Sequence, residues 1–230
     1  AAEEQARIAS LVAGIPGMSA LLEASGGTLT TVVIDLNTGR AATEITPATL
    51  GADLTDAGEA WSAVHHHEAV VHTAAIPDPL HHAPERVLAN NLLAAFNIVE
   101  ACVRSGIQRL VNISSETVPG YVFGDGEVLP DVLPIDETAA PRARDPYGFG
   151  KHVIEQWCDR TVERSELRIL SLRPSWVAHP GNYERNLGPV VREPFEPSLN
   201  FWAYTDRDDL AEAIRLAVES DADGHEVLYI

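Results

Sequence analysis

Short runs with strand character alternate with helical patterns along most of this chain, and that alternation restricts its fold more than any other feature. The helix expected between Pro84 and Ser105 shows the pattern: apolar residues recur at helical spacing, proline stands in the first turn, and Gly106 ends the helix. Strands and helices that alternate through short links predict an α/β fold, a doubly wound parallel sheet covered on both faces. The expected strands are Arg7–Ala13, Thr30–Leu36, Ala69–Thr73, Arg109–Ile113, Arg168–Leu172 and Glu226–Ile230. The expected helices are Met18–Ala24, Pro84–Ser105, Tyr147–Val162 and Asp208–Glu219.

Two stretches, about residues 116–146 and 175–205, break this rhythm. Both are rich in proline, glycine and aromatic residues, and both are too long to be plain connections. Each follows the end of a strand, and open α/β sheets bind their ligands at the carboxyl ends of their strands. We therefore expect these stretches to build a substrate pocket in a small C-terminal lobe. The 230 residues are enough for one sizeable core, so we expect a single domain over residues 1–230.

The balance of charges excludes some classes of partner. The net charge is −18, which repels nucleic acids and anionic membranes, and reflects either a salt-adapted host or a solubilising surface. No uninterrupted apolar run approaches the roughly 18 residues of a membrane span, and no signal peptide is visible. We expect a cytoplasmic protein with a small-molecule substrate and neither nucleic acid nor membrane as partner. Cys102 and Cys158 lie in apolar helical patterns, which favours buried free thiols.

One lysine, Lys151, stands among 16 basic Lys and Arg residues. An ammonium is a compact point charge on a flexible stem, unlike the planar guanidinium. Lys151 follows Tyr147 by four residues, so on a helix both side chains share one face. A nearby ammonium favours the phenolate and lowers the pKa of a tyrosine, which can then act as general base toward an alcohol. Ser114 and Ser115 directly follow the strand Arg109–Ile113, and a hydroxyl at this strand end can donate to the same substrate oxygen.

The first strand leads into Gly14-x-x-Gly17, a turn in which backbone amides can approach a pyrophosphate at the start of a helix. Asp35 lies 21 residues after Gly14, at the end of the second strand, where a carboxylate can hold both ribose hydroxyls. A carboxylate there repels the 2′-phosphate of NADP, so the pattern favours NAD, although Arg40 lies close downstream. A simple glycine turn remains the alternative for this segment.

Together these segments resemble the extended short-chain dehydrogenase/reductase family, the NAD-dependent epimerases and dehydratases. The resemblance rests on Gly14-x-x-Gly17-x-x-Ala20, Ala52–Asp56, His72–Ala75, the two serines and the tyrosine-x-x-x-lysine pair, with alanine in place of the usual last glycine. It implies a Rossmann-type fold. The cofactor-binding residues that it implies are Gly14, Gly17, Met18, Asp35, Asp53, Leu54, Ala74, Ala75, Asn91, Ser114, Tyr147, Lys151 and Pro174.

The resemblance also implies residue roles. Ser115 is the catalytic hydroxyl beside Tyr147 and Lys151, Ser114 lies beside the nicotinamide, and Asn91 supports the lysine or touches the cofactor. A buried asparagine satisfied by backbone is the alternative for Asn91. The implied substrate residues are Ser115, Glu116, Thr117, Trp176 and Arg185. Two long helices, Pro84–Ser105 and Tyr147–Val162, are those at which this family often forms dimers, so we expect a homodimer.

The reaction itself is less defined. The segment after Ser115 differs from that of sugar-nucleotide epimerases and locally resembles uronate dehydrogenases, and Trp176 stands where an asparagine often touches a nucleotide sugar. We therefore expect an oxidoreductase that acts on a hydroxyl of a sugar, sugar acid or small polyol. A nucleotide-sugar epimerase or dehydratase with tightly bound NAD is the first alternative, and a non-catalytic dinucleotide sensor is the second. The clustered histidines lack a carboxylate or cysteine at a recognised metal spacing, so we expect no metal.

Overall fold

The computed structural model describes residues 8–12, 29–35, 49–124, 128–186 and 201–230, and side chains for residues 51–124, 128–184 and 201–230. Its main sheet has seven parallel strands in the order β3-β2-β1-β4-β5-β6-β9. The strand order reverses between β1 and β4, which places a topological switch point there. The strands are β1 (Ile8–Val12), β2 (Leu29–Asp35), β3 (Thr49–Ala52), β4 (Ala69–His72), β5 (Arg109–Ile113), β6 (Arg168–Arg173) and β9 (His225–Tyr229).

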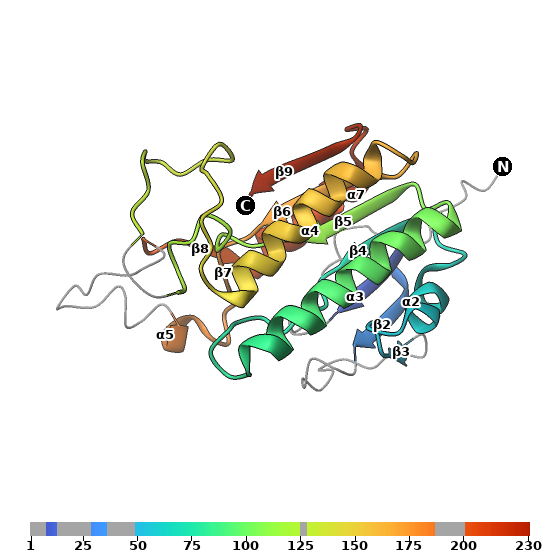
Figure 1. Ribbon diagram of the computed structural model, residues 1–230, viewed down its shortest axis with the longest axis horizontal. Coiled ribbons are helices and arrows are strands. Elements are labelled where there is room, and N and C mark those ends of the chain that lie inside the picture. Colours follow the sequence, from blue (N-terminus) through green and yellow to red (C-terminus); the bar gives the residue numbers. More distant parts are fainter. Residues whose placement is uncertain (1–7, 13–28, 36–48, 125–127, 187–200) are drawn as a thin grey trace.

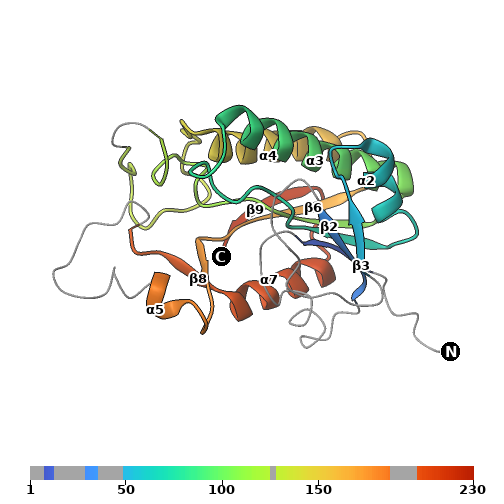
Figure 2. The ribbon, with the colours of Figure 1, turned by 90° about the horizontal axis from the view of Figure 1, so that it is seen from below.

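Helices cover both faces of this sheet, as the sequence predicts. Figures 1 and 2 show α2 (Ala57–Val64), α3 (Pro84–Ser105) and α4 (Pro146–Val162) on one face, with α7 (Arg207–Glu219) on the other. Every residue of β4 and β5 is buried, which is what a strand covered on both sides requires. The predicted doubly wound α/β fold is therefore confirmed.

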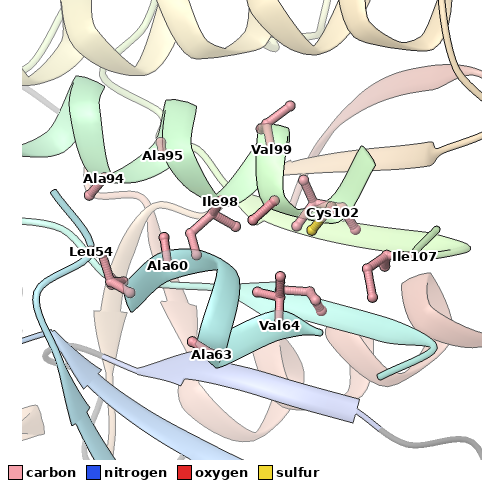
Figure 3. Close-up of a cluster of buried hydrophobic side chains, with 14 of the residues drawn as sticks. Leu54, Ala60, Ala63, Val64, Ala94, Ala95, Ile98, Val99, Cys102 and Ile107 are labelled. Atoms are coloured by element: carbon pink, nitrogen blue, oxygen red, sulfur yellow. The ribbon is translucent and has the colours of Figure 1, made fainter. Parts of the chain in front are cut away.

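The larger part of the core lies between the sheet and the three helices on its first face. Leu54, Val64, Ile98 and Leu110 are among its fully buried side chains, and Figure 3 shows α2 and α3 meeting over this cluster. Cys102 and Cys158 belong to it as buried free thiols, which confirms their prediction. A second cluster lies under α7 on the opposite face. Burying each such side chain contributes about 1.5–3 kcal/mol.

Local chemistry explains where the long helices begin and end. Pro84 opens α3, and Gly106 closes it in the left-handed conformation, with φ of 67°. The Asp145 side chain caps α4 by accepting hydrogen bonds from the backbone N–H groups of Tyr147 at 2.9 Å and Gly148 at 2.8 Å. This cap fixes the first turn of α4, and with it the position of Tyr147.

A small lobe stands at the carboxyl ends of the strands. It contains the parallel pair β7 (Trp176–Ala178) and β8 (Tyr204–Asp206), and the short helix α5 (Tyr183–Asn186). In Figure 1 it lies beside the loop that follows β5, at the end of the sheet toward which the strand arrows point. The described parts of the two irregular stretches lie at this end of the sheet, and their role as a substrate pocket stays a prediction. The pairing of β7 with β8 was not predicted, because each strand has only three residues.

Helix α3 has the length and apolar composition of a membrane span. Its inner face, however, packs against the core, and 56% of the most apolar window is buried inside the fold. It is the only such helix in the described part of the chain. The alternation of buried and exposed positions along α3 is that of a helix packed on a sheet.

Candidate active site

Tyr147 and Ser115 meet at the carboxyl end of β5. Tyr147 lies in the first turn of α4, and its phenol is hydrogen-bonded to the Ser115 side chain. The Ser115 oxygen accepts hydrogen bonds from the Thr117 backbone N–H at 3.2 Å and the Thr117 hydroxyl at 3.0 Å. A serine hydroxyl has two acceptor lone pairs and one donor hydrogen. With both lone pairs engaged by Thr117, the Ser115 hydrogen is left to donate to the phenol oxygen or to a substrate oxygen.

Lys151 follows one helical turn later and points the same way. Its Nζ donates to the Ile113 carbonyl at 2.5 Å and lies 5.6 Å from the centre of the Tyr147 ring. The side chain is buried, with 9% of the residue exposed. Ile113 ends β5 directly before the two serines, so one strand end binds the ammonium and supplies the hydroxyls. The structure thus brings the predicted trio of Ser115, Tyr147 and Lys151 together.

The pKa values in this site differ from the sequence expectation. Burial raises the pKa of Tyr147 to about 12, opposed by the hydrogen bond from Ser115 and reinforced by the nearby carboxylates of Asp145, Asp78 and Glu116. Burial lowers the pKa of Lys151 to about 8, opposed by the charge of Glu155. The phenol pKa therefore moves in the opposite direction to the sequence expectation, with loss of hydration as the largest cause, and Lys151 is not among the groups that shift it.

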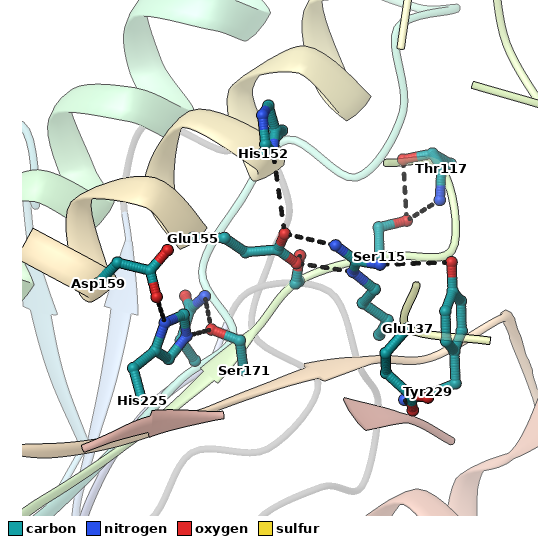
Figure 4. Close-up of polar contacts among 12 residues, drawn as sticks. Ser115, Thr117, Glu137, His152, Glu155, Asp159, Ser171, His225 and Tyr229 are labelled. Carbon is teal, nitrogen blue, oxygen red and sulfur yellow. Dashed lines mark hydrogen bonds and ion pairs between the residues drawn. The ribbon is translucent and has the colours of Figure 1, made fainter. Parts of the chain in front are cut away.

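A buried charge pair lies behind Ser114. The Ser114 hydroxyl donates to Glu155 Oε1 at 2.5 Å, and Arg173 binds the same carboxylate with Nε at 2.9 Å and Nη2 at 2.7 Å. Figure 4 shows the Glu155 carboxylate at the centre of this network, with His152 on its other side at 4.0 Å. Arg173 also lies over the ring of Tyr229, 5.4 Å from Cζ to the ring centre.

A separate polar chain in Figure 4 joins α4 to the last strand. His225 contacts Asp159 through Nδ1 at 2.7 Å and Ser171 through Nε2 at 2.9 Å. Asn112 donates to the same Ser171 oxygen at 3.1 Å. A serine, histidine and aspartate in a row suggest a nucleophile, but Ser171 is fully buried and no substrate reaches it. This chain fastens β9 and α4 to the sheet.

Asn91 is hydrogen-bonded to the backbone of the loop that follows β4. Its amide donates to the Ile76 carbonyl at 2.9 Å, and its oxygen accepts from the Ile76 N–H at 2.8 Å and from Asn90 at 3.2 Å. The side chain therefore holds the loop after β4, which contains the buried residues Ala74 and Ala75. The alternative of a buried amide satisfied by backbone describes this geometry, and contact with lysine or cofactor stays a prediction.

Two further cofactor candidates follow β3. The Asp53 carboxylate accepts from the Thr55 N–H at 2.9 Å and its hydroxyl at 2.6 Å, which makes a tight turn into α2. The Leu54 side chain is fully buried in the core. Asn97 of α3 holds the same turn by donating to the carbonyls of Leu54 and Thr55. The predicted adenine contacts of Asp53 and Leu54 stay predictions.

The described substrate candidates follow the strands β5 and β6. The Glu116 N–H donates to the Pro174 carbonyl at 3.1 Å, so the loop after β5 runs beside the end of β6. Trp176, two residues further, is half-exposed on β7 and pairs in register with Tyr204 of β8. Several predicted residues lie outside the described part of the chain: Gly14, Gly17, Met18, and the side chains of Asp35 and Arg185. The β2 backbone, which ends at Asp35, reaches the carboxyl edge of the sheet beside β3.

The described residues fit a nicotinamide dinucleotide at this edge. An ammonium has three donors, and among the described residues Nζ of Lys151 has one hydrogen-bond acceptor, the Ile113 carbonyl. Two donors thus remain for ligand hydroxyls. The described part of the chain holds no group of three or more His, Cys, Asp and Glu residues arranged for a metal.

The sequence reasoning assigned no individual role to four residues at this site. Glu155 and Arg173 form the buried pair, Asp145 caps α4, and His72 lies buried at the end of β4 with its Nδ1 lacking a hydrogen-bond partner among the described residues. A signal existed for Glu155, since it follows Tyr147 and Lys151 at the same four-residue spacing and so shares their helix face. The contact of Arg173 with Glu155 joins two distant segments, and spacing gives no sign of it.

Sequence comparisons find similarity to NAD-dependent epimerases and to a sugar dehydrogenase. The model of the NAD dependent epimerase/dehydratase family matches residues 12–229. UDP-glucose 4-epimerase 3 of Oryza sativa subsp. japonica is 29% identical over 179 residues, which are 69% of this chain and 45% of that protein. The L-arabinose 1-dehydrogenase (NAD(P)(+)) of Haloferax volcanii is 30% identical over 130 residues, 54% of this chain and 51% of that protein.

Solved structures share the fold. A glucuronic acid dehydrogenase from Chromohalobacter salexigens superimposes with a TM-score of 0.72 at 18% identity, over 97% of this chain and 76% of that one. The chain spans about half the length of the two curated relatives named above.

Proposed function

Because the chain belongs to the NAD-dependent epimerase/dehydratase family, we propose that it is an NAD-dependent oxidoreductase acting on a hydroxyl of a sugar, sugar acid or related small polyol. Its place of action is the cytoplasm, and its partner is a small molecule rather than nucleic acid or a membrane. The observation that carries this proposal is the hydrogen-bonded pair of Ser115 and Tyr147, with Lys151 buried one turn along the same helix.

Each residue has a distinct part in the proposed reaction. Ser115, with both lone pairs occupied by Thr117, donates its hydrogen to the substrate oxygen. Tyr147 in its phenolate form accepts the hydroxyl proton as the carbon–hydrogen bond breaks and a carbonyl forms. The pKa of about 12 keeps that form scarce in the protein without cofactor, and the positive charge of a bound nicotinamide ring would favour it. Lys151 holds the ribose of the cofactor with its two remaining donors. NAD, when bound, supplies the acceptor for the hydride, so the alcohol is oxidised as NAD is reduced.

The direct test is NADH formation from aldoses, uronates and nucleotide sugars, followed at 340 nm. Tyr147→Phe removes the hydroxyl and keeps the ring, so we expect turnover to fall by about 10²–10⁴-fold, the range for loss of a general base. NAD affinity, measured by calorimetry, should change little. A Tyr147→Phe variant with unchanged turnover contradicts the assignment, and unchanged partner binding without any turnover in the wild type indicates a sensor instead.

A nucleotide-sugar epimerase is the second candidate. It is favoured by the similarity to the rice protein named a UDP-glucose 4-epimerase, which extends over more of this chain than that to the archaeal dehydrogenase. In an epimerase the hydride returns to the same sugar, so NADH does not accumulate. Activity without added NAD, with cofactor released only on denaturation, distinguishes this reaction from the dehydrogenase.

We also propose that the protein is a homodimer through the outer faces of α3 and α4. These two helices lie side by side in Figure 1, and Leu93, Phe96 and Phe149 on them are each 40% or more exposed. Phe96 also contacts Trp157, with ring centres 5.1 Å apart. A second copy of the same face would bury this apolar surface. Sedimentation equilibrium tests it: wild type should be a dimer, and Phe96→Asp a folded monomer, whereas a monomeric wild type refutes it.

A further inference from the structure

The buried charge pair of Glu155 and Arg173 is placed to act on the two groups that flank it. Glu155 is 4% exposed and Arg173 is 5% exposed, and two hydrogen bonds join them in parallel. Burying a charge pair costs more hydration than it returns in many proteins, and apolar residues of similar volume often do as well. A contribution to stability alone therefore does not explain why a charge pair is buried at this depth. Its other contacts indicate what it does.

The first of these contacts is Ser114. Its hydroxyl donates to Glu155 Oε1, and its backbone N–H donates to the Leu172 carbonyl at 2.7 Å, so side chain and backbone are both held. With 1% of the residue exposed, Ser114 has no freedom to turn without losing a charge-assisted hydrogen bond. Glu155 thus fixes the end of β5, directly between the carbonyl of Ile113 and the hydroxyl of Ser115.

The second group is Lys151, one turn before Glu155 on α4. The Ile113 carbonyl that binds its Nζ belongs to the residue next to Ser114, so lysine and glutamate grip the same strand end. The titratable groups around Lys151 in the described structure are Tyr147 and Glu155 on α4 and His72 at the end of β4. Of these, Glu155 is the anion, and its charge opposes the effect of burial on the ammonium.

We propose that Glu155, clamped by Arg173, is a positioning residue that fixes the Ser114 hydroxyl and provides the counter-charge which keeps Lys151 an ammonium. The catalytic consequence of this proposal rests on the function proposed above. The positions of the side chains on which it is based rest only on the geometry of α4, β5 and β6.

The single lysine allows a direct test. Protein labelled with ¹³C at lysine Cε gives one side-chain resonance, from Lys151, and its chemical shift reports the ionisation of Nζ. For the wild type we expect a midpoint near the pKa of about 8. In Glu155→Gln the opposing charge is gone while burial remains, so we expect the midpoint to fall by about one pH unit or more.

Loss of the carboxylate leaves Arg173 buried without a partner, and Glu155→Gln is therefore at risk of unfolding. The double variant Glu155→Met/Arg173→Met removes both charges and fills the same volume, and Glu155→Asp keeps the charge but withdraws it by one methylene. We expect a lowered midpoint in the double variant and a smaller decrease in Glu155→Asp. The matched control is Glu163→Gln, at the exposed end of the same helix, which should leave the midpoint within a few tenths of a unit.

Folded double and Glu155→Asp variants that both titrate like the wild type overturn the proposal. The titration uses neither NAD nor substrate, so the two proposals fail separately. A wild type that turns over no sugar contradicts the proposed function and leaves the Glu155 result standing. Where the enzyme is active, the alkaline limb of kcat/KM should move to lower pH in the double variant, in parallel with the resonance, while a purely structural role would leave that limb unmoved.

Discussion

At the two titrating residues of the catalytic trio, loss of hydration and a contact with a neighbouring side chain shift the pKa in opposite directions. Tyr147 and Lys151 are both buried, and burial pushes their pKa values in opposite directions, to about 12 and about 8. Both shifts favour the neutral form of the group. The residues that resist them are neighbours: Ser115 for the phenol and Glu155 for the ammonium. The chemistry of the site therefore depends on these two neighbouring side chains, which favour the charged forms of the phenol and the ammonium.

Thr117 is the neighbour that orients Ser115. Thr117→Val removes the hydroxyl that donates to the Ser115 oxygen and keeps the shape of the side chain. A neutral hydrogen bond contributes about 0.5–1.5 kcal/mol, so we expect kcat to fall by about 2- to 12-fold. Thr117→Ser keeps the hydroxyl and should recover most of the rate. Steady-state kinetics on both variants decide this, and equal rates in the valine and serine variants would show that Ser115 needs no such support.

His72 makes stability depend on pH. Burial, together with the charge of Lys151, lowers its pKa from 6.5 to about 3, so the folded protein holds the ring neutral. The unfolded chain binds the proton more tightly, and stability is therefore lost as the pH falls below 6.5 toward 3. Between pH 7 and pH 5 the loss from this residue is roughly 2 kcal/mol. Urea unfolding at both pH values measures it.

His72→Leu should remove most of that difference, and His66→Asn, at an exposed position, should leave it intact. If His72→Leu loses as much stability as wild type between pH 7 and pH 5, then other groups carry the acid sensitivity.

At the scale of elements, two glycines of the helical layer have opposite effects. Gly106 has φ of 67° at the end of α3, where no neighbouring atom lies within 4 Å of an added Cβ. Gly150 lies inside α4, where an added Cβ would meet Leu88 of α3 at an ordinary 3.5 Å. Gly106→Ala should therefore destabilise the protein by about 1 kcal/mol through backbone strain alone. Gly150→Ala should stabilise it by about 0.4–1 kcal/mol, and thermal unfolding of the pair checks both signs.

Most elements could be predicted from the sequence, for a physical reason. The helix Pro84–Ser105 and the strand Arg109–Ile113 agree with prediction. The pattern of apolar residues that forms each of them lies within its own segment of the sequence. The short strands β7 and β8 could not be predicted, since a three-residue strand depends on its partner rather than on its own pattern. In the site, the spacing of Ser115, Tyr147 and Lys151 along the sequence allowed their prediction. Arg173 carried none, because only the folded sheet brings it to Glu155.

For the whole molecule, the net charge and the local ion pairs predict opposite effects of salt on stability. Exposed pairs such as Arg160 with Glu163 and Arg215 with Glu212 are weakened by salt, but each contributes at most about 1 kcal/mol. A net charge of −18 repels itself throughout the folded chain, and salt screens that repulsion. We therefore expect the Tm at pH 7.5 to rise by about 5 °C between 0.1 M and 1 M NaCl, at about 2–4 °C for each kcal/mol.

The rise should shrink as the pH approaches the isoelectric point of about 4.7, because the repulsion that salt screens disappears there. Calorimetry at pH 7.5 and pH 5.5, each at both salt concentrations, separates this cause from a general effect of salt on apolar burial, which would persist at the lower pH. A Tm that falls with salt at pH 7.5 would mean that the surface charges are arranged as stabilising pairs. The acidic residues would then stabilise the protein through local ion pairs. The net negative charge would in that case not stabilise the single buried ammonium of Lys151.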